Sequence, residues 1–206
     1  MKPDRGRMWI NLGLLLLAAA LLLSVGNVYD SRRAGETSRQ VVEQMCQNVE
    51  TAPETTGETE APAIPEYLLD ADREMPVQTV DNRDYIGVLT IPALELELPV
   101  ISQWDYPSLK VAPCRYSGSL YQNNLIICAH NYASHFGKLK NLHVGDIAMF
   151  TDMAENTVTF QMVERETIQP EDLEAMDAGD WDMTLYTCTV GGKSRVTVRF
   201  ARVEEQ

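Results

Sequence analysis

Basic residues are scarce in this sequence, and they do not cluster. The 206 residues include 17 Lys and Arg against 30 Asp and Glu, which gives a formal net charge of -13. Recognition of nucleic-acid phosphates needs clustered Lys and Arg, so the composition argues against a nucleic-acid-binding protein. We attribute the excess of acidic residues to solubility.

Metal-binding motifs are also missing. The four cysteines contain no CxxC pair, and the three histidines, His130, His135 and His143, do not form HExxH. Structural zinc sites and zinc proteases use such spacings. We therefore expect neither a metal site nor a cofactor.

An uncharged apolar run occupies residues 8–28, MWINLGLLLLAAALLLSVGNV. It has about the 20 residues that a helix needs to cross a bilayer, so we predict a transmembrane anchor. Three basic residues in 1–7 precede it, and the positive-inside rule then keeps residues 1–7 in the cytoplasm and exports the remainder. A cleaved signal peptide ending near Ser24-Val25-Gly26 is the alternative, but the run exceeds the usual apolar core of about 7 to 15 residues.

Export bears on the cysteines, because an oxidising exterior permits disulfides. Cys46, Cys114, Cys128 and Cys188 allow three full pairings, and their spacings match no disulfide-rich scaffold.

Composition divides the exported part in two. Residues 29–81 are rich in Thr, Glu and Pro and have little apolar periodicity, so we predict a flexible stalk in which TSRQVVEQMCQNV is too short to be a stable helix alone. From residue 82 to 206, short β-like runs alternate with turns, which predicts an all-β barrel or sandwich. The runs are YIGVLTI, LELELPVI, NLIICAH, DIAMFT, TVTFQMV, MTLYTC and SRVTVRF.

Two short helices are expected between these strands. HFGKLKNL can form a helical turn that packs Phe136, Leu139 and Leu142, and PEDLEAM begins with Pro and acidic residues, as helix N-termini often do. The remainder of residues 164–180 is interpreted as a long acidic loop.

Side chains alternate along a strand, which sorts the residues around Cys188. Thr184, Tyr186 and Cys188 share one face of the MTLYTC strand, and we expect Met183 and Leu185 on the other face to point into the core.

The same parity brings in two further strands. On the last strand Val196, Val198 and Phe200 point inward, which leaves Arg195 on the opposite face, seven residues after Cys188. On NLIICAH, Cys128 and His130 share a face. Three strand ends can therefore supply a cysteine, a histidine and an arginine to one groove.

These three residue types fit acyl transfer through a thioester. A nearby cation favours the thiolate form of Cys188, His130 can move the protons, and Arg195 can hold the oxyanion. Each residue also has a simpler interpretation, because strand cysteines are often small buried hydrophobes and the other two can be structural or solvated.

A family resemblance strengthens the catalytic interpretation. TLYTC at 184–188, followed by Arg195 and preceded by AHN at 129–131, resembles the sortases, the cell-surface cysteine transpeptidases of Gram-positive bacteria. IGVLTIPALELELPV and HFGKLKNLHVGDIAMF resemble further stretches of the family, so the likeness extends over about residues 85–203.

The resemblance implies an eight-stranded β-barrel that cleaves a C-terminal, LPXTG-like sorting signal of an exported protein. By motif position Cys188 is the nucleophile, His130 the general acid and base, and Arg195 the holder of oxyanion and substrate. Thr184, Tyr186 and Cys128 would line the substrate groove. The acyl group would pass to an amine, which in the family comes from a peptidoglycan precursor in cell-wall anchoring or from a pilin lysine in pilus assembly; we expect the peptidoglycan precursor.

Some features depart from the family pattern. Ala129 replaces a usual Gly, no apolar segment follows Val203 as in many pilus-building members, and HN in place of HR resembles class B. The subclass therefore stays open. Calcium activates some members, but the acidic residues at 164–172 cannot be matched to that site.

Two other functions remain compatible with the sequence. Water instead of an amine as acceptor gives a surface cysteine peptidase (a hydrolase), and loss of the chemistry gives a stalked binding module.

A reversible disulfide between Cys128 and Cys188 would add redox control if their Cα atoms lie within about 7 Å.

Overall fold

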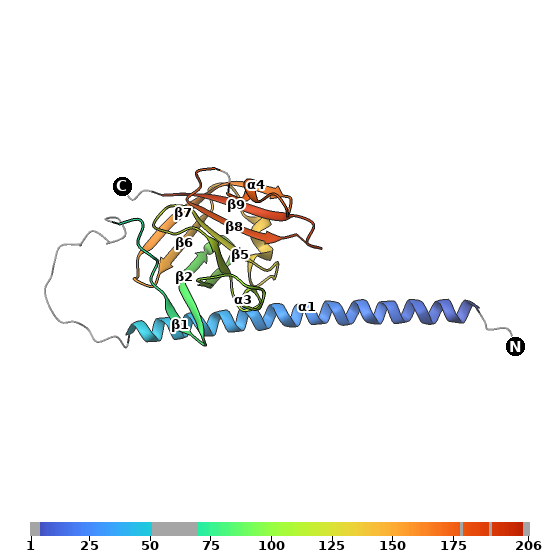
Figure 1. Ribbon diagram of the computed structural model, residues 1–206. Helices are drawn as coiled ribbons and strands as arrows, with labels where there is room; N and C mark the ends of the chain where they lie inside the picture. The colour runs from blue at the N-terminus through green and yellow to red at the C-terminus, as the bar shows by residue number, and fades with distance from the viewer. Residues whose placement is uncertain (1–4, 51–69, 178, 190, 204–206) are drawn as a thin grey trace.

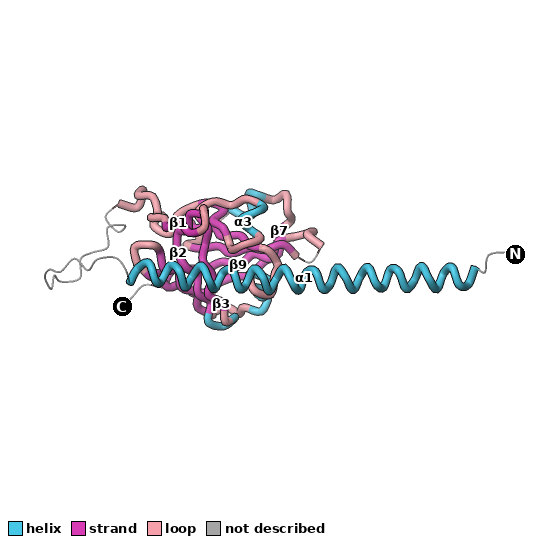
Figure 2. Tube along the Cα trace, turned by 90° about the horizontal axis from the view of Figure 1, so that it is seen from below, coloured by secondary structure: helices cyan, strands magenta, loops and turns pink. Residues whose placement is uncertain are grey.

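The computed structural model describes residues 5–50, 70–177, 179–189 and 191–203, which form one long helix and one β-barrel (Figure 1). Helix α1 (Arg5–Glu50) is continuous. Its N-terminal half is exposed and projects away from the barrel, and its C-terminal half lies along the barrel wall in both views (Figure 2). Among the described residues, only α1 is long and apolar enough to cross a membrane.

The C-terminal half of α1 occupies part of the predicted stalk. Residues 29–50 are helical, and a stripe of side chains at helical spacing is buried against the barrel, namely Ala34, Ser38, Val41, Val42 and Met45. The expectation of an unpacked segment here is wrong, because the barrel supplies the apolar surface that a short amphipathic helix lacks alone. Residues 51–69 of the predicted stalk lie outside the described residues.

Nine strands form one sheet in the order β1-β2-β3-β4-β5-β8-β9-β7-β6. Pairing of β2 with β6 closes strands β2 to β9 into an eight-stranded barrel, which confirms the predicted fold. The strands are β1 (Gln78–Val80), β2 (Arg83–Ile91), β3 (Leu96–Ile101), β4 (Cys114–Ser117), β5 (Leu125–Ala129), β6 (Ile147–Asp152), β7 (Thr157–Ile168), β8 (Met183–Cys188) and β9 (Arg195–Arg202).

Strand β1, which the sequence did not reveal, is added to the barrel through a tight hairpin. It pairs with the beginning of β2, and the two turn residues, Asp81 and Asn82, both have positive φ. This is the geometry of a type I′ turn, which Asp and Asn tolerate well.

The barrel core follows the predicted parity. Met183 and Leu185 of β8 and Val198 and Phe200 of β9 are fully buried in one cluster. Because side chains alternate along a strand, the residues between these apolar positions point away from the core and can line a pocket.

Four short helical segments connect the strands: η1 (Pro92–Leu94), α3 (Tyr106–Leu109), η2 (Phe136–Asn141) and α4 (Leu173–Asp177). Two confirm the expected helices. Phe136, Leu139 and Leu142 are buried at and after η2, and α4 begins after Asp172, whose carboxylate accepts a hydrogen bond from the Ala175 amide.

The predicted acidic loop is shorter than expected at its beginning. Residues 164–168 continue β7 and pair with β9, from Glu164 opposite Arg199 to Ile168 opposite Arg195. Backbone pairing with β9, and not burial of apolar side chains, holds this part of the strand. Its side chains can therefore be mostly polar. An alternation of apolar and polar residues is therefore absent here, and the prediction of a loop was wrong.

Candidate active site

Two parallel strands end side by side at one end of the barrel. β5 and β8 pair in parallel, with Ala129 opposite Thr187. The next residues are His130 and Cys188, which therefore lie on neighbouring strand ends at about the 4.8 Å spacing of a sheet. β8 also pairs with β9, where Cys188 is the register partner of Arg195.

All three residues line one pocket of about 220 Å³. Its walls come mainly from two connections, residues 104–109 between β3 and β4 and residues 169–176 between β7 and β8. A larger hollow of about 340 Å³ lies between α1 and the barrel, but its lining contains no cysteine or histidine. The chemistry of the lining selects the first pocket as the candidate active site.

The three predicted substrate contacts are placed differently. Tyr186 and Cys128 line the pocket beside Cys188. Thr184 is 2% exposed, and its hydroxyl accepts a hydrogen bond from Arg199 Nη1 at 3.0 Å. The structure thus buries Thr184 beneath the β7–β8 connection, which corrects its predicted place in the groove.

Thr187 joins the two strand ends that lead to Cys188 and His130. Its hydroxyl donates a buried hydrogen bond of 2.8 Å to the carbonyl of Ala129. This contact lies one residue before both Cys188 and His130. Thr187 therefore fixes the position of Cys188 relative to His130 without lining the pocket.

The surroundings of His130 favour its neutral form. Burial, followed by the charge of Lys110, lowers the pKa of His130. The ring packs against Tyr132 at a centroid distance of 5.0 Å. A neutral imidazole near pH 7 is ready to accept the proton of a neighbouring thiol.

A second histidine lies behind this pair. His135 is fully buried, and its ring is 5.6 Å from that of Tyr132. Within the described residues neither ring nitrogen makes a hydrogen bond of good geometry. Burial, followed by the charge of His130, lowers the pKa of His135 to about 4.

We expect His135 to make the protein less stable as the pH falls from 6.5 to 4. In this range the unfolded chain binds a proton on His135 that the native state rejects, so the free energy of unfolding decreases by about 3 kcal/mol. Urea titrations at pH 7, 5.5 and 4.5 measure this loss. His135→Phe should remove most of it, whereas replacing the exposed His143 with Gln should not; an unaltered pH dependence in His135→Phe contradicts the assignment.

The sequence comparison decides the family. The model of the sortase domain matches residues 89–203, more than half of the chain. The chain belongs to the sortase family. No curated protein matches the sequence significantly.

Solved sortase structures share the fold at low sequence identity. Sortase C from Streptococcus pneumoniae is 20% identical, with a TM-score of 0.60 over 81% of this chain and 97% of that one. A sortase D5 transpeptidase from Clostridium perfringens is 18% identical, with a TM-score of 0.56 over 82% and 97%. SortaseC1 from Streptococcus suis is 23% identical, with a TM-score of 0.53 over 59% and 74%. These similarities confirm the barrel.

Arg199 is a structural residue of this sortase that its sequence did not reveal. An arginine on the same strand face as Arg195 is ordinarily solvated, yet Arg199 is 1% exposed. Its guanidinium pairs with Glu166 at 2.9 Å and donates to the backbone carbonyls of Ala175 and Met176. Arg199 thereby holds α4, and with it one wall of the pocket, onto the barrel.

Replacing Arg199 with Met is expected to destabilise this sortase by about 3 kcal/mol, the lower end of the range for breaking a buried ion pair, because Glu166 is partly exposed. Two carbonyls of α4 and the Thr184 hydroxyl lose their donor as well. Chemical denaturation measures the change. The free energies of unfolding of Arg199→Met and of the double variant Arg199→Met/Glu166→Gln should differ by less than the loss that Arg199→Met causes alone. Full stability of Arg199→Met would contradict the assignment.

Aromatic residues form a further wall that local sequence patterns did not reveal. Tyr186 packs edge-to-face on Tyr116 at 5.6 Å, and Tyr116 lies 6.0 Å from Trp104. These residues come from three separate segments, so only the folded barrel brings them together. The row extends from Tyr186, two residues before Cys188, to the exposed Trp104.

The geometry disfavours the hypothetical disulfide between Cys128 and Cys188. Cys114, Cys128 and Cys188 are all free thiols. Cys128 pairs with Tyr186, two residues before Cys188, so strand spacings put the two Cα atoms about 8 Å apart, beyond the limit of about 7 Å. Burial raises the pKa of Cys128 to about 11, which keeps it a thiol.

No group of three or more His, Cys, Asp or Glu side chains that could hold a metal ion occurs in the part of the chain that the structure describes.

Proposed function

We propose that this sortase cleaves a C-terminal, LPXTG-like sorting signal and transfers the new acyl end to an amine of a peptidoglycan precursor. The convergence of His130, Cys188 and Arg195 on one pocket of a sortase barrel carries the proposal. Sortases are cysteine transpeptidases; the signal and the acceptor amine are the proposed details.

In the first half-reaction the thiol of Cys188 attacks the carbonyl carbon of the scissile peptide bond. The neutral His130 takes the thiol proton, and the Arg195 guanidinium stabilises the negative charge that develops on the carbonyl oxygen. Collapse of the tetrahedral intermediate breaks the C–N bond, and protonated His130 gives its proton to the leaving amine. The products are a thioester on Cys188 and the released C-terminal fragment.

In the second half-reaction an amine attacks the thioester carbonyl. His130 accepts a proton from the attacking nitrogen, the C–S bond breaks, and protonated His130 returns the proton to the sulfur, which restores the thiol of Cys188. Water as acceptor follows the same steps and gives hydrolysis. The half-buried position of Cys188, between the aromatic wall and the β7–β8 connection, supports restricted access of water to the thioester.

We further propose that residues 8–28 of α1 span the cell membrane, with residues 1–7 in the cytoplasm and the barrel outside. The apolar N-terminal half of α1 and the basic residues that precede it support this orientation. Membrane-bound precursors and exported proteins would then be within reach of the pocket.

A ligation assay tests the proposed function. The full chain in detergent is incubated with a panel of sorting-signal peptides and an amine acceptor, and products are identified by mass spectrometry. We expect a cleaved peptide joined to the amine in excess over the hydrolysed peptide. Hydrolysis alone would indicate a peptidase, and no Cys188 thioester with any peptide would refute both enzymes and leave a binding module.

A further inference from the structure

The barrel follows the proposed membrane span with almost no intervening chain. The apolar run ends at Val28, and Ser31 already contacts the barrel, where its carbonyl accepts a hydrogen bond of 2.6 Å from Ser134 Oγ. Three residues of helix rise only about 4.5 Å, less than the headgroup layer of about 5 to 7 Å in one leaflet. The barrel therefore begins at the depth of the headgroups.

The connection between the span and the barrel is rigid. α1 is continuous through this region, and at Gly35 a Cβ would lie 2.9 Å from the Cβ of Ser134, so the helix touches the barrel closely. Ser38 and Val41 continue the contact; the Ser38 hydroxyl donates to the carbonyl of Val111. Without a hinge, the direction of α1 fixes which end of the barrel meets the bilayer.

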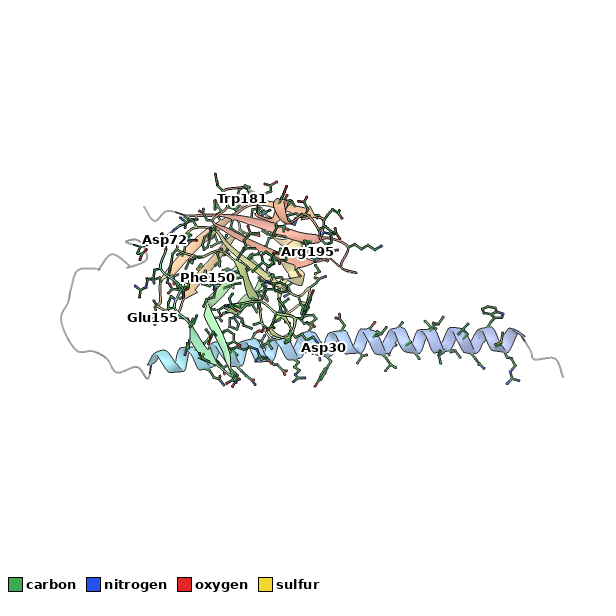
Figure 3. All side chains as sticks on the ribbon, viewed as in Figure 1. Asp30, Asp72, Phe150, Glu155, Trp181 and Arg195 are labelled. Atoms are coloured by element: carbon green, nitrogen blue, oxygen red, sulfur yellow. The ribbon has the colours of Figure 1, made fainter. Side chains whose placement is uncertain are left out.

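That end is the one with the pocket. Ser31 and Gly35 of α1 contact Ser134, which lies two residues after Tyr132, and the Tyr132 ring packs on His130. Figure 3 shows Arg195 on the side of the barrel from which the N-terminal half of α1 projects, with Asp30 on the helix below it. β8 also runs toward this side, and Cys188 is at its C-terminal end (Figure 1).

The rim of the pocket carries side chains suited to a lipid interface. Trp104 and Tyr106 line the pocket, yet they are 44% and 73% exposed and pack edge-to-face at 5.9 Å. Tryptophan and tyrosine are enriched at the headgroup level of membranes. Lys110, which follows α3, and Lys193, in the β8–β9 loop, are exposed and add positive charge to a chain that is acidic overall.

We propose that Trp104 and Tyr106 rest in the outer headgroup layer, so that the pocket opens at the bilayer surface at a height that α1 sets. This inference rests on the proposed function and on the proposed span. It predicts that transfer from a membrane-tethered peptide depends on the height at which α1 holds Cys188 above the bilayer.

Tryptophan fluorescence tests the contact with lipid independently of catalysis. The chain has three tryptophans, and Trp9→Phe with Trp181→Phe leaves Trp104 as the only one. In nanodiscs that contain a headgroup-nitroxide phosphatidylcholine, we expect strong quenching of Trp104, equal in the Cys188→Ala background.

The matched control leaves Trp181 instead, through Trp9→Phe with Trp104→Phe. Trp181 precedes the start of β8, about 20 Å along the strand from the Cys188 end. It should escape quenching. Quenching of Trp104 no stronger than that of Trp181 would overturn the inference and leave the proposed function intact.

A helical insertion tests the functional consequence. Seven added helix-forming residues after Val28 lift the barrel by about 10 Å and turn it by only about 20°. We expect transfer from a vesicle-tethered donor peptide to fall at least about tenfold, with transfer from the same soluble peptide unchanged. The same insertion after Glu50, beyond the buried contacts of α1, should leave transfer from both donors unchanged. For the insertion after Val28, unchanged transfer from the tethered donor, or an equal loss with both donors, would overturn the inference.

Discussion

Cys188→Ala is expected to abolish both thioester formation and peptide transfer. No other described cysteine can replace the nucleophile, because burial raises the pKa of Cys128 to about 11 and also raises that of Cys114. Loss of a nucleophile from a catalytic set can lower kcat on the order of 10⁶-fold, so transfer should fall to background. Intact-protein mass spectrometry after mixing with a sorting-signal peptide detects the acyl adduct directly.

Cys114→Ala is the matched control for this substitution. Cys114 is fully buried and does not line the pocket, so its variant should still form the adduct on Cys188, although with some loss of stability. Circular dichroism confirms that both variants are folded. An adduct that persists in Cys188→Ala would refute the assigned nucleophile.

His130→Gln is expected to lower kcat/KM by about 10² to 10⁴-fold, the usual contribution of a general acid and base. In the unmodified enzyme activity should fall on the acid side of pH 6.5, because burial and Lys110 lower the pKa of His130 and only the neutral ring accepts the thiol proton. The variant should lose this acid limb. Initial rates of transfer between pH 5 and pH 8 measure both effects.

The substitution keeps a polar side chain and removes the titrating imidazole ring, with its packing on Tyr132. A loss of activity without any change in the shape of the pH profile would assign His130 a positioning role instead. His143→Gln, at an exposed site outside the pocket, should retain both the rate and the profile.

Much of the barrel could be predicted because its strands have one buried face. Alternation of apolar residues placed Met183, Leu185, Val198 and Phe200 correctly in the core. The same parity put Tyr186 and Cys188 on the pocket side, since a strand that buries one face must present the other.

Parity failed where another segment covers the outward face. Thr184 has the predicted orientation, but the β7–β8 connection lies over it, and Arg199 fills the space between. A strand pattern reports which face a side chain occupies and carries no information about loops that fold back from a distance. The buried ion pair of Arg199 with Glu166 was hidden for the same reason, because its partner lies 33 residues away.

The order of residues therefore determined the composition of the site, the strand faces and the apolar run at the N-terminus, because these follow from local periodicity and from motif spacing. Only the tertiary structure decided that α1 continues from that run onto the barrel, that His135 and Arg199 are buried, and that Arg195 lies on the side of the barrel from which the exposed half of α1 projects (Figure 3). Each depends on contacts between segments far apart in the chain, whose free energy no short stretch of sequence contains.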